Sequence, residues 1–173
     1  SVMASILKVN TIQDATNSTT AMTIDTAGRI LTPARPIFSC SASGQSNLAN
    51  GATTTVTWTE ITDIGSNFAS NTFTAPVGGH YQLNVNIDFR QLSNNTNSLY
   101  NVYLVTTNRT YQHSTSGFDS DTQNRFQSVS LCHVCDMDAS ETAIVQVLAE
   151  NQDTGHHLLD VGSNSRFSGF LVG

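Results

Sequence analysis

The sequence has little charge, and most of the charge it has is acidic. Charged residues make up 12% of the 173 residues, about half of the usual share. Seven basic and thirteen acidic side chains give a net charge of −6, and Lys8 is the only lysine. Proteins that bind nucleic acids need clustered Lys and Arg to neutralise phosphates. We therefore predict no nucleic-acid partner.

Long hydrophobic runs and cysteine are also scarce. No stretch approaches the roughly 18 apolar residues that cross a bilayer, so we predict no membrane insertion. Residues 1–4 lack the basic and apolar regions of a secretory signal peptide, and we interpret Met3 as the initiator. The three cysteines, Cys40, Cys132 and Cys135, are too few for a disulfide framework in a chain of this length.

Catalytic motifs are absent as well. The sequence contains no Gly-x-Ser-x-Gly, His-Glu-x-x-His or Gly-x-x-x-x-Gly-Lys-Ser/Thr pattern. Ser, His and Asp are common, but nothing in their spacing pairs them. We predict that the protein is not an enzyme and has no catalytic residue.

The run Cys132-His133-Val134-Cys135 is the one cluster of metal-ligand types. In a strand, residues i and i+3 point to opposite faces, so Cys132 and Cys135 do not converge on one ion. We predict no metal site here, and buried Cys acting as a small hydrophobe is the main interpretation. A ring of His133 side chains around a three-fold axis is the alternative.

The abundant residues favour β-structure. Strong helix formers are few, Ser, Thr and Asn supply about a third of the chain, and hydrophobic residues reach 38%. Residues 81–89 alternate strictly, with apolar side chains at odd positions, which predicts a strand with one buried face. Further strands are predicted at residues 37–42, 53–59, 99–106, 109–113, 129–135, 143–149 and 166–172. This spacing is typical of an all-β sandwich or jelly roll.

Residues 1–34 differ from the rest. We predict short strands at residues 4–12, 21–25 and 29–31, with a turn at Thr26-Ala27-Gly28. About seven large apolar residues in thirty cannot offset the entropy cost of ordering the segment. It is therefore disordered, packed on the main domain, or intertwined with other copies. We favour the last, and divide the chain into an N-terminal segment (1–34) and a head (35–173).

Three motifs of the head resemble the C1q globular domain. The first is Phe73, followed after five residues by Gly79-His80-Tyr81 and the alternating strand. Pro76 and the Gly78-Gly79 pair predict a tight corner there, with positive φ at glycine and Phe73 packed near Tyr81. The closing run 165–172, with its Phe-Ser-Gly-Phe-Leu core, and the opening run 35–39 resemble the last and first strands of that family.

This resemblance implies a tumour-necrosis-factor-like jelly roll that assembles as a homotrimer. Apolar residues on both faces of the strands at 99–106 and 143–149 agree with a second surface covered by a neighbouring subunit. The residues that we assign to the core or the trimer contact are Phe73, Tyr81, Leu83, Val85, Phe167 and Phe170.

The N-terminal segment resembles the leader of structural and fibre proteins of marine tailed phages, through residues 5–12 and 22–31. That resemblance implies a virion protein: a fibre, spike or capsid decoration that joins other virion proteins through residues 1–34. Its head would contact a glycan or protein on the host surface. The alternative is a secreted, extracellular C1q-like lectin or adhesin that binds carbohydrate.

Recognition loops are expected where the longest polar stretches lie, at residues 93–98, 114–124 and 151–157. The residues that we select as binding residues are Asn94, Asn95, Asn97, Asp119, Asp121, Asn124, His156 and His157. Some members of the resembled family bind calcium, and Asp119 and Asp121 are ligands of the right type. Because Ca²⁺ takes six to eight oxygens, we predict no cofactor, with calcium the one ion that these loops suit.

Overall fold

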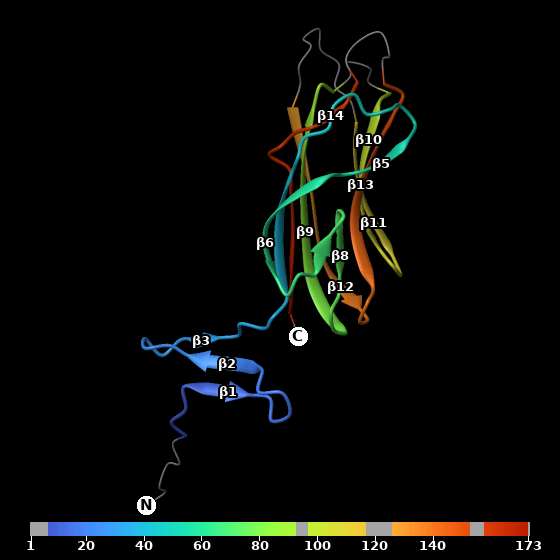
Figure 1. Cartoon of the computed structure of the whole chain (residues 1–173). Coiled ribbons are helices and arrows are strands. Elements are labelled where there is room, and N and C mark those ends of the chain that lie inside the picture. Colours follow the sequence, from blue (N-terminus) through green and yellow to red (C-terminus); the bar gives the residue numbers. More distant parts are fainter. Residues whose placement is uncertain (1–6, 93–96, 117–125, 153–157, 173) are drawn as a thin grey trace, which may run out of the picture. The chain divides into compact units, whose positions relative to one another are not determined.

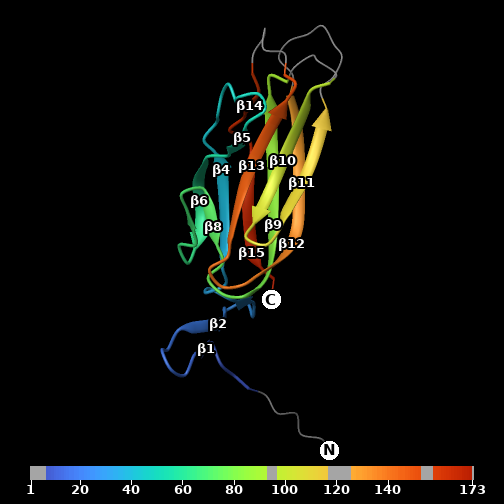
Figure 2. The same cartoon turned by 90° about the vertical axis from the view of Figure 1, so that its right-hand side faces the viewer.

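The computed structural model describes residues 7–92, 97–116, 126–152 and 158–172. The chain forms two compact units, Ser1–Arg35 and Pro36–Gly173, which we call the leader and the head (Figures 1 and 2). The described residues include no helix long and apolar enough to cross a membrane.

The leader is a three-stranded antiparallel sheet in the order β1-β2-β3. Its strands are β1 (Thr11–Gln13), β2 (Thr20–Ile24) and β3 (Ile30–Leu31). The predicted turn before β3 is confirmed, with Gly28 at φ 80° and its N–H donating to the Asp25 carbonyl at 2.9 Å. The strand predicted over residues 4–12 is confirmed only at its end: residues 7–10 are not in a strand, and β1 begins at Thr11.

The head is a sandwich of two antiparallel sheets, as the sequence predicts (Figure 2). The sheet that we call the β9 sheet has the order β12-β9-β15-β4-β6, with β14 paired to β9. Its strands are β4 (Ile37–Ala42), β6 (Trp58–Ile64), β9 (Gly79–Arg90), β12 (Phe126–Met137), β14 (Asp160–Val161) and β15 (Arg166–Leu171).

The other sheet, which we call the β10 sheet, has the order β11-β10-β13-β8-β7, with β5 paired to β13. Its strands are β5 (Thr53–Thr55), β7 (Phe68–Ala69), β8 (Thr72–Thr74), β10 (Leu99–Thr106), β11 (Thr110–Ser116) and β13 (Thr142–Glu150). The chain passes from one sheet to the other repeatedly, for example between β8 and β9.

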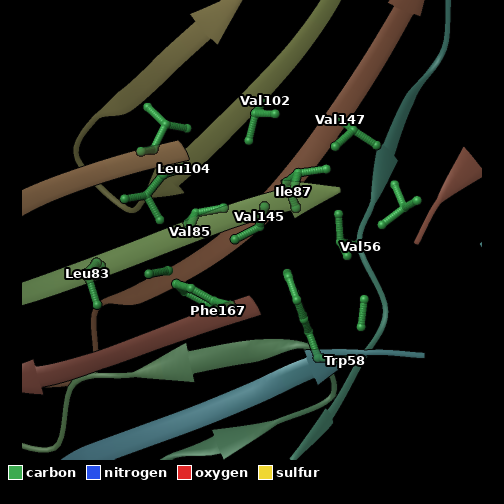
Figure 3. Close-up of a cluster of buried hydrophobic side chains, with 14 of the residues drawn as sticks. Val56, Trp58, Leu83, Val85, Ile87, Val102, Leu104, Val145, Val147 and Phe167 are labelled. Carbon is green, nitrogen blue, oxygen red and sulfur yellow. The ribbon is translucent and has the colours of Figure 1, made fainter. Parts of the chain in front are cut away.

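The core lies between the two sheets. Every odd residue from Tyr81 to Phe89 is buried, which confirms the predicted alternation in β9. The inward side chains of β13 face them from the opposite sheet (Figure 3). Phe38 packs against three aromatic rings, those of Phe68, Phe73 and Phe167, at centroid distances of 5.2, 4.6 and 4.9 Å.

Several predicted strands of the head differ from the structure, among them the stretches 53–59 and 109–113. The stretch 53–59 is not one strand: β5 and β6 lie in different sheets, and the chain crosses between them at Val56, which is fully buried. A β-branched run favours extended backbone but does not indicate a change of sheet. The strand predicted at 109–113 is longer, and covers Thr110–Ser116.

The corner before β9 forms as predicted around Phe73 and Tyr81, whose ring centroids lie 5.3 Å apart. The Tyr81 hydroxyl donates to the carbonyl of Val77 at 2.8 Å. The positive φ expected at a glycine is found at Gly79, whose φ of 158° is close to extended backbone rather than left-handed.

Candidate subunit-contact face

A row of apolar side chains crosses the outer face of the β9 sheet. In register, Val134 lies opposite Gln82, Gln82 opposite Phe170, Phe170 opposite Ile37, and Ile37 opposite Ile64. One residue from each of the five strands therefore stands in a single line, and only Gln82 is polar. We call Val134, Phe170, Ile37 and Ile64 the apolar row.

The four side chains of the apolar row point away from the core. Their inward neighbours along the same strands, such as Cys135 and Phe38, are buried, and side chains alternate between the faces of a strand. Val134 is 56% exposed, and Phe170, Ile64 and Ile37 are 40%, 40% and 39% exposed. An exposed apolar row of this kind, interrupted only at Gln82, is a candidate contact surface.

The next positions along the same face are polar. The row beside the apolar one contains Cys132, Asn84, Ser168, Ser39 and Thr62. Side chains on this part of the face bond to one another: the Gln82 amide donates to Asn84 Oδ1 at 3.2 Å, and the Asn86 amide donates to Ser130 Oγ at 2.9 Å. The apolar row is therefore confined to one end of the face, which we call the Met137 end.

The opposite end of the face, the Arg90 end, is charged and aromatic. Arg90 Nη2 donates to Asp88 Oδ2 at 2.9 Å, and the Arg90 guanidinium lies 5.6 Å from the ring centroid of Phe126. Phe126 is 62% exposed. The Gln91 amide donates to Asp160 Oδ2 at 2.8 Å. A cation, two carboxylates and an exposed ring together suit polar ligands with an apolar face.

The predicted binding loops leave the sandwich at the Arg90 end. Leu99 pairs with both Ser116 and Glu150, and Arg90 pairs with Phe126, so the strands that flank these loops end together. Of the predicted binding residues, only Asn97 is described; it is exposed, and its carbonyl accepts the Asn151 amide at 3.3 Å. The others lie outside the described residues: Asn94, Asn95, Asp119, Asp121, Asn124, His156 and His157.

The residues assigned to the core or the trimer contact fall into two groups. Five are buried between the sheets: Phe73, Tyr81, Leu83, Val85 and Phe167. Phe170 differs, because it belongs to the apolar row on the outer face.

The outward apolar residues of β10 and β13 are less exposed than the apolar row. Five of them are half-buried within the single chain: Leu99, Tyr103, Val105, Ile144 and Leu148. From the sequence, we expected the outer surface of these two strands to be covered by a neighbouring subunit. The structure instead leaves the apolar row of the β9 sheet more exposed than these residues.

The Cys132–Cys135 run does not form a metal site within the described part of the chain. Cys132 is exposed and Cys135 is buried, so the two thiols lie on opposite faces as predicted. The His133 ring stacks on Tyr111, with centroids 4.2 Å apart. Among the described residues no group of three His, Cys, Asp or Glu side chains could hold a metal ion.

The apolar row is not visible as a unit in the amino-acid sequence. Its members lie far apart in the chain, at positions 37, 64, 134 and 170. One signal was present: Val134 and Phe170 each interrupt the polar positions of an alternating strand. Only the strand register, however, brings the four residues into one line.

Comparison with known proteins supports the fold. No protein-family model and no curated protein matches the chain. The globular domain of zebrafish complement 1qA protein superposes with a TM-score of 0.56 at 19% identity, covering 80% of this chain and 98% of that one. Murine APRIL superposes at pH 8.0 and pH 5.0 with TM-scores of 0.54 and 0.55, each at 12% identity, covering 80% of this chain and 99% of that one. The chain carries a C1q/TNF-like jelly-roll fold.

Proposed function

We propose that the head is a homotrimeric, non-enzymatic binding domain, whose subunits meet along the apolar row of the β9 sheet. The observation that carries this proposal is the line formed by Val134, Phe170, Ile37 and Ile64. Neighbouring strands lie roughly 4.8 Å apart, so the axes of five adjacent strands span about 19 Å. This width suits a surface of a second protein better than a small ligand.

A trimer with a three-fold axis would cover the apolar row of every subunit. A contact between one face of a subunit and a different face of the next is heterologous, and such contacts form a closed ring when the rotation is that of a three-fold axis. The resemblance to C1q-type domains implies the same symmetry. The polar part of the face, with Asn84, Asn86 and Ser130, would then form the wetter rim of the contact.

We further propose that the protein is a phage virion component, a fibre, spike or capsid decoration that contacts the host surface. The leader would join it to other virion proteins. The Arg90 end would present the polar loops to a host glycan or protein. Three weak contacts on one trimer gain avidity because they are linked. The division into a small N-terminal sheet and a larger sandwich supports this arrangement.

Sedimentation of the full chain at micromolar concentration tests the trimer. We expect a stable trimer for the wild type, and dissociation for Phe170→Asp, because a charge would be buried in the contact. Val77→Asp is the matched control, since Val77 is also exposed but lies outside the apolar row. A well-behaved single protomer for the wild type, or a Phe170→Asp trimer as stable as the control, would overturn the proposal.

Binding to the host surface is tested separately with the trimer. Labelled protein should bind intact host cells, and treating the cells with glycosidase or with protease distinguishes a glycan from a protein receptor. If the labelled trimer does not bind host cells, the host-contact role is wrong, and the proposed trimer is unaffected.

A further inference from the structure

The leader has one apolar face and one polar face. In register, Ile12 lies opposite Met22, and Ile24 lies opposite Ile30. Directly opposed residues share a face of a sheet, and Met22 and Ile24 are two residues apart on β2. Four large aliphatic side chains therefore gather on one face, which we call the leader face.

The other face of the leader is different in character. It carries Thr11, Thr23 and Leu31, which are aligned across the three strands. Leu31 is its one large apolar side chain. The leader is thus a small amphipathic sheet.

No residue of the leader that the structure describes (7–35) covers the leader face. Ile12, Ile24 and Ile30 remain 45%, 37% and 62% exposed. Apolar surface that stays in water contributes no burial energy to offset the entropy cost of ordering the leader, so covering this face would stabilise it. The strands are also short, at three, five and two residues, so their hydrogen bonds alone cannot hold the sheet.

We infer that the leader faces of three copies pack against one another, so that the three small sheets form a shared apolar centre. This inference rests on the proposed trimer of the head. The leader joins the head directly at Arg35 and Pro36, and a short tether between units that are already associated raises the effective concentration of the second contact to the millimolar range.

The chemistry of the leader face suits a second copy. All four side chains are aliphatic and lack polar atoms that a specific foreign partner would have to satisfy. The charges of the leader nearly cancel, with Lys8, Arg29 and Arg35 against Asp14 and Asp25. Arg29 is also paired with Asp25 in the same turn, at 2.6 Å. Three leaders can therefore approach without strong repulsion.

Cross-linking of the full chain tests this inference. In a Cys132→Ser background, which removes the exposed native thiol, Ile30→Cys places a thiol on the leader face and Leu31→Cys places one on the opposite face. The two positions are adjacent and similarly exposed. With a short bis-maleimide, we expect at least about tenfold more covalent dimer for Ile30→Cys than for Leu31→Cys, because only the former is held near its copies.

Limited proteolysis with trypsin is a second measurement of the same contact, and it does not depend on introduced cysteines. Trypsin can cleave after Arg29, whereas Pro36 protects the bond after Arg35. We expect Ile24→Ser to accelerate cleavage at Arg29 markedly, and Leu31→Ser to change it little.

The outcomes separate the two proposals. A trimeric chain in which Ile30→Cys and Leu31→Cys cross-link equally, or in which Ile24→Ser and Leu31→Ser are cleaved alike, overturns the leader contact and leaves the head trimer intact. A wild-type chain that sediments as a protomer overturns the head trimer and the leader contact together.

Discussion

Gly169 lies directly opposite Leu83 in the pairing of β15 with β9, and a methyl group of Leu83 occupies the space where a side chain at Gly169 would begin. A Cβ placed on Gly169 would lie 2.5 Å from Leu83 Cδ2 and 2.7 Å from Phe38 Cε1. Both neighbours are buried in the core. The glycine of the closing strand is therefore a packing requirement, which lets two large side chains fill the centre of the β9 sheet.

Gly169→Ala should accordingly destabilise the head. The added methyl group would force Leu83 or Phe38 out of its position in a close-packed core, which costs about 1–3 kcal/mol. Urea denaturation followed by circular dichroism measures the free energy of unfolding. Gly78→Ala is the control, because the nearest atom to its new Cβ would be 3.8 Å away; we expect a change within about 0.5 kcal/mol. Equal effects of the two substitutions would contradict the packing argument.

Parts of the fold could be predicted because their signals are local. The alternation from Tyr81 to Phe89 requires only that one face of a strand be buried. The structure places the odd-numbered residues of this stretch between the sheets. The bounds of β4 and β10 match the predicted ranges, since apolar residues fill these segments and turn residues flank them.

Other parts depend on contacts that a local pattern does not contain. Val56 separates β5 from β6 within one β-branched run, and the change of sheet there is decided by which strands lie beside each half, β13 for one and β4 for the other. The apolar row requires the relative register of five strands. Ile37 and Ile64, for example, become neighbours only through a pairing that contains a bulge between Ser39 and Cys40.

The buried thiols should make stability fall at alkaline pH. Burial, together with the carboxylates of Glu60 and Asp63, raises the pKa of Cys40 to about 12, and burial also raises the pKa of Cys135. An unfolded thiol ionises near pH 8.5. The stabilisation is therefore complete below that pH and is lost as the pH rises toward 12, because the unfolded chain releases its protons first.

Substitution isolates the contribution of Cys40 to this fall of stability at alkaline pH. Above about pH 9, each such thiol lowers the free energy of unfolding by up to about 1.4 kcal/mol per pH unit. Cys40→Ala should show a shallower decline than the wild type in urea denaturation at pH 7.5, 9 and 10. Cys132→Ser should follow the wild type, since Cys132 is exposed. Parallel curves for Cys40→Ala and the wild type would show that Cys40 ionises as it does in the unfolded chain.

Gln152 holds together two segments that form no strand. Its Oε1 accepts the Leu159 N–H at 2.7 Å, its amide donates to the Leu48 carbonyl at 3.4 Å, and the side chain is buried. Gln152→Met keeps the volume but leaves a buried N–H and a buried carbonyl without partners, at about 1–3 kcal/mol each.

The matched substitution for this prediction is Gln146→Met. Gln146 faces outward from β13 and makes only a 3.5 Å hydrogen bond to Thr55 Oγ1, so its loss should cost less than about 1 kcal/mol. Thermal denaturation of both variants measures the difference. If Gln152→Met melts at the same temperature as Gln146→Met, water replaces the lost partners and the segment is not held by this side chain.

The head should fold without the leader. Among the residues that the structure describes, every buried hydrophobic residue of the core lies between Phe38 and Phe167. We therefore expect the apolar burial that stabilises the sandwich to remain when residues 1–35 are deleted. Trp58 is the only tryptophan and is buried near Phe167, which makes its fluorescence a direct report on the core. Residues 36–173 should show emission typical of a buried indole and a single cooperative transition in urea. Exposed-indole emission before denaturant is added would contradict this prediction, because it would mean that the leader supplies part of the core.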